Sequence, residues 1–257
     1  MKIAVTGKGG VGKTTLAAVL ARLYAGEGKK VLAVDVDPDA NLGLALGFSP
    51  AEVNSITPIA KMKELIAERT GASSDGMGKF FKLNPKVDDI PERFSIEKYG
   101  VKLLVMGTVE TGGGGCVCPE NVMVKQLLSH LVIARDEVVI MDMEAGLEHL
   151  GRGTAASMDR FIAVVEPGSR SIQTYQRVKQ LAADLGIKKV QVVANKIRGS
   201  EDESYFSDII PKADFLGFIH FSDTVINADR QGISPFETCP AVTNDIRLIK
   251  EKIDSQG

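Results

Sequence analysis

The chain has 257 residues, of which 44% are hydrophobic and 25% charged, and its formal net charge is −2. These values are typical of a globular protein with a sizeable core, and the absence of a long basic run disfavours a nucleic-acid partner. The longest apolar runs are too short to span a bilayer, and the N-terminus lacks the pattern of a signal peptide, so we expect a cytoplasmic protein with no membrane partner. Three cysteines in a chain of this length do not suggest a disulfide framework.

Short apolar runs typical of buried strands alternate with helix-length segments along the chain. We predict a helix over residues 14–27 and strands over residues 2–7, 30–37, 101–108, 137–143, 159–167, 189–196 and 214–221. Continuous apolar strands that alternate with helices favour a parallel sheet covered on both faces. The predicted fold is therefore α/β: one doubly wound domain over residues 1–257, with a mostly parallel sheet of about seven strands.

Two segments do not follow this rhythm. Residues 59–100 are polar and contain no strand-like run, so we predict a variable insertion that begins with a helix over residues 59–70. Residues 111–121 read TGGGGCVCPEN, in which four glycines precede two cysteines. We expect this second segment to be a metal-binding loop.

A phosphate-binding loop follows the first predicted strand. Residues 7–14 read GKGGVGKT and match the G-x-x-x-x-G-K-[ST] pattern, in the strand–loop–helix context that the pattern requires. The backbone of Gly9, Gly10, Val11 and Gly12 can wrap around phosphates, and Lys13 can reach the β- and γ-phosphates. The Thr14 hydroxyl can bind Mg²⁺, and the Thr15 hydroxyl can bond the α-phosphate. The loop thus predicts binding of ATP or ADP with Mg²⁺.

Acidic side chains follow two of the buried strands, at the edge where such sheets bind ligands. Asp142 ends one strand, where we expect it to hold Mg²⁺ through water. Asp35 and Asp37 end another, and Asp37, which precedes a proline, is our candidate for positioning the attacking water. Asp39 is the second candidate, although an ordinary turn explains it slightly better.

Asn195 and Lys196 close a later strand in the run VVANKIR. An asparagine amide can read a purine edge because it both donates and accepts, and the Lys196 stem can lie across a base. An ordinary strand-to-loop turn is an equally good explanation of this segment.

Cys116 and Cys118 form a C-x-C pair whose sulfurs point to the same side of an extended chain. Thiolates arranged in this way suit a soft or borderline metal such as Ni²⁺ or Zn²⁺. Two thiolates do not complete a tetrahedral site, and a second copy of the chain would supply the other two, which predicts a homodimer. The alternative is that these two cysteines are buried and inert. For Cys239 we prefer this buried, inert interpretation.

Three motifs resemble a known family. KGGVGKTT resembles the deviant Walker A motif of the family that includes the nitrogenase iron protein and the chromosome-partitioning and division-site ATPases, while DVDPD and DMEAG resemble its switch I and switch II regions. The resemblance implies ATP hydrolysis by a dimer, in which Lys8 reaches the nucleotide of the partner subunit. Lys8, Lys13 and Asp37 would then be the catalytic residues.

Longer segments of the sequence resemble one subgroup of this family. LNPKVDDIPERF, DMEAGLEHLGRGTA and GGGGCVCPEN resemble the CooC-type maturation ATPases of carbon monoxide dehydrogenase and the related factor for acetyl-CoA synthase. This resemblance implies that Cys116 and Cys118 bind metal between two subunits, and that ATP drives nickel delivery to one of these client enzymes. Two alternatives stay open: an ATP-gated interaction switch, and an iron–sulfur reductase or scaffold.

Overall fold

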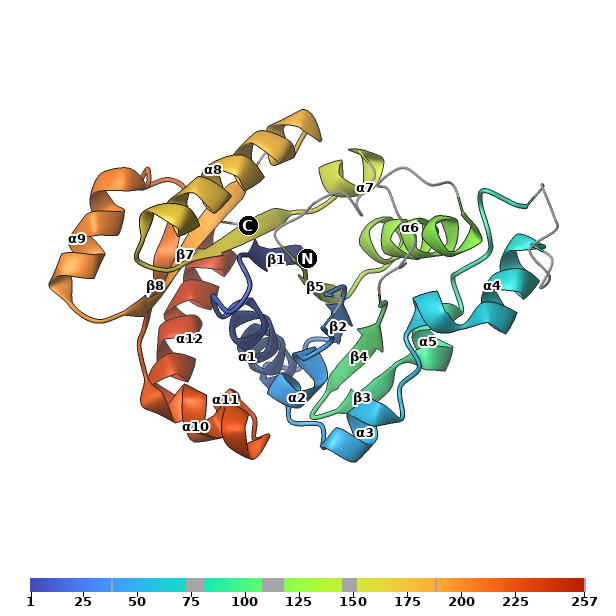
Figure 1. Ribbon diagram of the computed structural model, residues 1–257, viewed down its shortest axis with the longest axis horizontal. Helices are drawn as coiled ribbons and strands as arrows, with labels where there is room; N and C mark the ends of the chain where they lie inside the picture. The colour runs from blue at the N-terminus through green and yellow to red at the C-terminus, as the bar shows by residue number, and fades with distance from the viewer. Residues whose placement is uncertain (38, 73–80, 108–117, 145–151, 188, 257) are drawn as a thin grey trace.

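The computed structural model describes residues 1–37, 39–72, 81–107, 118–144, 152–187 and 189–256. Within them the chain forms an eight-stranded sheet in the order β3-β4-β2-β5-β1-β6-β7-β8 (Figure 1). The strands are β1 (Lys2–Gly7), β2 (Val31–Asp35), β3 (Ile96–Lys98), β4 (Val101–Val105), β5 (Val138–Asp142), β6 (Arg160–Val165), β7 (Val190–Ile197) and β8 (Phe215–His220). Every neighbouring pair is parallel except β3 and β4. The predicted fold class is confirmed.

Helices cover both faces of the sheet. They are α1 (Lys13–Gly26), α2 (Leu42–Leu46), α3 (Pro50–Asn54), α4 (Lys63–Thr70), α5 (Ile90–Phe94), α6 (Pro119–Ile133), α7 (Arg152–Ala156), α8 (Ser169–Asp184), α9 (Ser200–Ile209), α10 (Asp223–Gln231), α11 (Pro235–Thr238) and α12 (Pro240–Ser255), with a 3₁₀ turn, η1, over Ile59–Lys61. Helices α6 and α8 lie on one face of the sheet and α1 and α12 on the other (Figure 1). Their buried side chains form two separate cores. Successive strand residues such as Ile3 and Ala4 enter opposite cores, which explains the unbroken apolar runs in the sequence.

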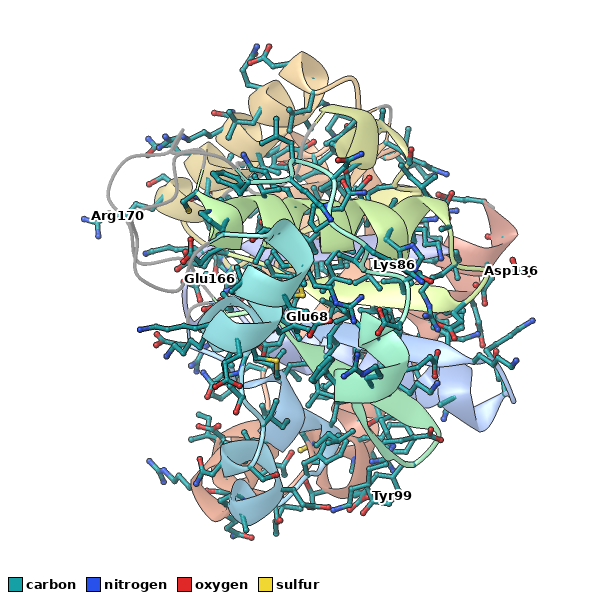
Figure 2. All side chains as sticks on the ribbon, turned by 90° about the vertical axis from the view of Figure 1, so that its right-hand side faces the viewer. Glu68, Lys86, Tyr99, Asp136, Glu166 and Arg170 are labelled. Atoms are coloured by element: carbon teal, nitrogen blue, oxygen red, sulfur yellow. The ribbon has the colours of Figure 1, made fainter. Side chains whose placement is uncertain are left out.

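The segment over residues 59–100 contains a strand that the sequence analysis did not anticipate. β3 is short, half-exposed and antiparallel to β4, so it carries no apolar run that would reveal it. A two-residue turn joins the two strands, with positive φ angles of 54° at Tyr99 and 75° at Gly100, as tight hairpins require. Figure 2 shows this side of the molecule, with Tyr99 at the tip of the hairpin.

The predicted helix over residues 59–70 is interrupted. η1 ends at Lys61 and α4 begins at Lys63, because Met62 adopts a ψ of 73°, outside the helical range. The division of the chain into one domain with an insertion stays a prediction.

Candidate nucleotide-binding site

The loop over residues 7–14 connects β1 to α1 and is shaped by two crowded glycines. A Cβ at Gly7 would lie 2.5 Å from the Val164 carbonyl oxygen, and a Cβ at Gly12 would lie 2.1 Å from Asn195 Nδ2. Gly12 is also the N-cap of α1, with a φ of 98° and no side-chain cap. The first N–H groups of α1 are therefore available to an anion placed in the loop.

Lys13 faces the loop that follows β2. Its ammonium Nζ lies 3.7 Å from Asp37 Oδ2, and the Lys13 side chain is only 7% exposed. The structure thus brings together the predicted phosphate-binding lysine and the candidate water-positioning carboxylate, although they are distant in sequence.

Thr14 and Asp142 meet across the end of the sheet. The Thr14 hydroxyl donates to Asp142 Oδ2 at 2.6 Å, while the buried Asp142 Oδ1 has no hydrogen-bond partner among the described residues. Burial raises the pKa of Asp142 to about 6, against the lowering effects of Thr14 and Lys13. A buried carboxylate oxygen without a partner beside a hydroxyl is the donor set that Mg²⁺ prefers, so these residues fit the predicted ion.

Asp35 was named in the sequence analysis only for its place at a strand end. Its side chain is fully buried, and it accepts hydrogen bonds from the backbone N–H groups of Asp37 and Leu42. Burial raises the pKa of Asp35 to about 7, and the neighbouring charge of Asp142 contributes to this rise.

Asp39 has the geometry of an ordinary turn residue. Its N–H donates to Asp37 Oδ1 at 3.0 Å, and its carbonyl accepts from Asn41 Nδ2 at 2.9 Å. These are local contacts of the kind that Asp and Asn make in turns.

Asn195 and Lys196 lie at the same edge of the sheet, but the Asn195 amide contacts the phosphate-binding loop. Asn195 Nδ2 donates to the Val11 carbonyl at 2.7 Å, and Asn195 Oδ1 accepts from the Lys196 N–H at 2.7 Å. Lys196 Nζ pairs with Glu166 at 2.7 Å. In this arrangement Asn195 supports the loop, and its reading of a purine stays a prediction.

A cleft of about 820 Å³ is lined by many of these groups, but not by Asp35 or Asp142. The predicted residues that line it are Gly9, Gly10, Gly12, Lys13, Thr14, Thr15, Asp37, Asp39, Asn195 and Lys196. Lys8 is exposed and is not among the lining residues. A second opening of about 480 Å³, beside Met1 and Asp254, contains none of the predicted site residues.

One wall of the cleft was missed by the sequence analysis. It is formed by the segment that follows β8, including Phe221, Val225, Ile226 and Pro235, and the Arg198 guanidinium stacks 4.0 Å from the Phe221 ring. The sequence position of Phe221 could have indicated this wall. Phe221 directly follows the last strand, so it lies at the same carboxyl edge of the sheet as the phosphate-binding loop.

The predicted metal loop lies largely outside the described residues, and Cys116 is among those not described. Cys118 is half-buried and extended, directly before α6. Within the described part of the chain, no group of three or more His, Cys, Asp or Glu side chains could hold a metal ion. The shared cysteine site stays a prediction.

Together, the glycine-rich loop between a strand and a helix, its lysine and threonine, and the aspartate that ends a neighbouring strand define a P-loop nucleotide-binding protein. The chain belongs to the CobQ/CobB/MinD/ParA nucleotide binding domain family, whose model matches residues 2–236.

The most informative relative confirms the narrower resemblance. The chain is 49% identical to the carbon monoxide dehydrogenase accessory protein CooC of Rhodospirillum rubrum over 241 residues, which are 94% of this chain and 91% of that protein. It is also 47% identical to an uncharacterized ATP-binding protein of Methanocaldococcus jannaschii, over 90% of each chain.

Solved structures support the fold. A plasmid partition protein of Borrelia burgdorferi bound to AMPPNP superposes with a TM-score of 0.69 at 15% identity, over 100% of this chain and 99% of that one. Among the described residues, no helix combines the length and apolarity needed to cross a membrane.

Proposed function

We propose that this protein is an ATPase that delivers nickel to the nickel–iron–sulfur cluster of carbon monoxide dehydrogenase or acetyl-CoA synthase. The observation that carries the proposal is the 49% identity to CooC, an accessory protein of carbon monoxide dehydrogenase, over 94% of this chain. A cytoplasmic setting is part of the proposal and is expected from the sequence.

The geometry of the cleft supports ATP hydrolysis. Lys13 would bind the β- and γ-phosphates, and these would replace Asp37, 3.7 Å away, as its main partner. Asp37 would then be free to orient water toward the γ-phosphate. Thr14 and Asp142 would hold Mg²⁺, which neutralises charge that develops on the phosphates. Catalysis would come from positioning and electrostatic stabilisation.

A homodimer would link the nucleotide to the cargo metal. Lys8 lies in the phosphate-binding loop and is exposed, which suits a lysine that serves the nucleotide of a partner subunit. Cys116 and Cys118 from two chains would supply the four thiolates of a closed site for Ni²⁺ or Zn²⁺. Closure around ATP would change the relative placement of these cysteines and hence the affinity for the metal.

The first experiment compares the wild type with the double variant Cys116→Ser/Cys118→Ser, using Cys239→Ala as a control that removes a cysteine from the buried core. Anaerobic protein is loaded with Ni²⁺, and metal per chain and molecular mass are measured with and without ATP. We expect one nickel ion per two chains for the wild type and the control, and none for the double variant. Only the wild type and the Cys239→Ala control should activate a nickel-free client enzyme.

Three outcomes would contradict the proposal. A full equivalent of nickel on each wild-type monomer would exclude the shared site, and nickel retained by the double variant would place the ligands elsewhere. Absorption bands of an iron–sulfur cluster in the anaerobic protein would support the reductase or scaffold alternative instead.

A further inference from the structure

One buried carboxylate holds both ends of the loop that carries Asp37. Asp35 is the last residue of β2 and is 0% exposed. Its Oδ1 accepts the N–H of Asp37 at 3.2 Å, and its Oδ2 accepts the N–H of Leu42 at 2.9 Å. The backbone is therefore held at Asp37 and at Leu42 by two hydrogen bonds to a single side chain.

The second of these bonds replaces a missing helix cap. Leu42 is the first residue of α2, and the N-cap residue Asn41 makes no side-chain cap because its amide donates to the Asp39 carbonyl. The Asp35 carboxylate supplies an acceptor for this first-turn N–H. The start of α2 is thus fixed from the sheet.

A buried carboxylate at residue 35 destabilises the folded state. None of the ion pairs among the described residues includes Asp35, and its neighbour in register on β5 is a second acid, Asp142. Burial of a charge without an ionic partner destabilises a fold, and an apolar side chain would fill the same space at lower cost. The structural benefit that the described contacts show is the placement of the loop.

That placement determines where Asp37 points. The Asp37 N–H is held by Asp35, and the Asp37 carboxylate lies 3.7 Å from Lys13 Nζ in the phosphate-binding loop. We propose that Asp35 is a positioning residue that clamps the backbone at Asp37 and Leu42 so that Asp37 meets the nucleotide phosphates. This inference rests on the proposed ATPase function.

Asp35→Asn is the test variant because it keeps the side-chain shape and one acceptor oxygen, but directs an amide nitrogen at a backbone N–H. We expect kcat for ATP hydrolysis to fall roughly 10- to 100-fold, as small misplacements of a catalytic group do. The affinity for ATP and the melting temperature should change little, since the phosphate-binding loop is intact. Asp254→Asn is the control: it also removes a carboxylate acceptor, here for the Tyr24 hydroxyl and the Lys250 ammonium, and Asp254 does not line the cleft.

A second readout does not depend on turnover. Amide hydrogen exchange in peptides that cover residues 36–46 should be faster in Asp35→Asn than in the wild type, with ADP present, and unchanged in Asp254→Asn. Amide hydrogen exchange at the wild-type rate in Asp35→Asn would contradict the proposed clamp. An unchanged kcat for ATP hydrolysis in this variant would contradict it as well. A joint fall of kcat, ATP affinity and melting temperature would show a general structural role instead. If the wild type hydrolysed no ATP, the proposed function would fail, while hydrogen exchange would still decide the clamp.

Discussion

Gly12 and Asn195 occupy interdependent positions in the cleft. Gly12 adopts a φ of 98°, which side chains rarely adopt, and its α-carbon faces the Asn195 amide so closely that a methyl group would displace it. The amide in turn donates to the Val11 carbonyl. A substitution at Gly12 would therefore disturb both the loop backbone and the residue that supports it.

We predict that Gly12→Ala loses nucleotide affinity by roughly 5- to 150-fold, because holding residue 12 in the binding conformation would cost about 1–3 kcal/mol of backbone strain. The measurement is the dissociation constant of a fluorescent ATP analogue. Gly26→Ala is the control: Gly26 lies in the same helix, has open space around it and does not adopt a positive φ. Equal affinity for the two variants would show that the loop tolerates a side chain at residue 12.

At the scale of elements, His220 connects three of them at the edge of the sheet. Its ring lies at the end of β8, with Nδ1 2.9 Å from Asp245 of α12 and Nε2 3.4 Å from Glu203 of α9. The hydrogen bond to Asp245, followed by the charge of Asp245 and the contact with Glu203, raises the pKa of His220. A protonated His220 thus holds α9 and α12 to the sheet edge.

The raised pKa predicts a pH-dependent contribution to stability. Because the folded state binds the proton more tightly than the unfolded state, the stabilisation is complete below the usual histidine pKa of about 6.5 and disappears as pH rises through the folded-state value. The side chain is 52% exposed, so solvent screening limits the effect to less than about 1 kcal/mol.

His220→Gln should therefore lower the free energy of unfolding at pH 5.5 and leave it nearly unchanged at pH 9. Urea denaturation of the wild type and the variant at both pH values measures this difference. A deficit of equal size at the two values would mean that packing, and not the proton, accounts for the contribution of His220.

At the scale of the whole molecule, the exposed Lys8 provides the test of a nucleotide-dependent dimer. If Lys8 serves the partner's nucleotide, Lys8→Ala should still bind ATP as a monomer but fail to dimerise on ATP. Sedimentation of wild type, Lys8→Ala and the exposed-surface control Lys63→Ala, each with ATP and with ADP, measures this. ATP-dependent dimers of unchanged strength in Lys8→Ala would remove the trans role.

The sequence alone determined the parallel α/β fold and the seven strands that carry apolar runs, because strands buried on both faces leave a continuous signal. It also determined the phosphate-binding loop, whose glycines, lysine and threonine are fixed at short spacings by the backbone geometry around a phosphate. The sequence did not predict β3, because this three-residue, half-exposed strand is formed by its pairing with β4 and not by its own side chains.

Only the tertiary structure decided the contacts between distant segments. The Asp35 clamp, the support of Val11 by Asn195 and the wall formed by Phe221 and Val225 all depend on which strand ends become neighbours. Local spacing contains no such information, since strand order in a doubly wound sheet is set by crossovers and by the burial of both faces. The sequence therefore predicted the residues that would contact phosphate, whereas the fold revealed which side chains hold them in place.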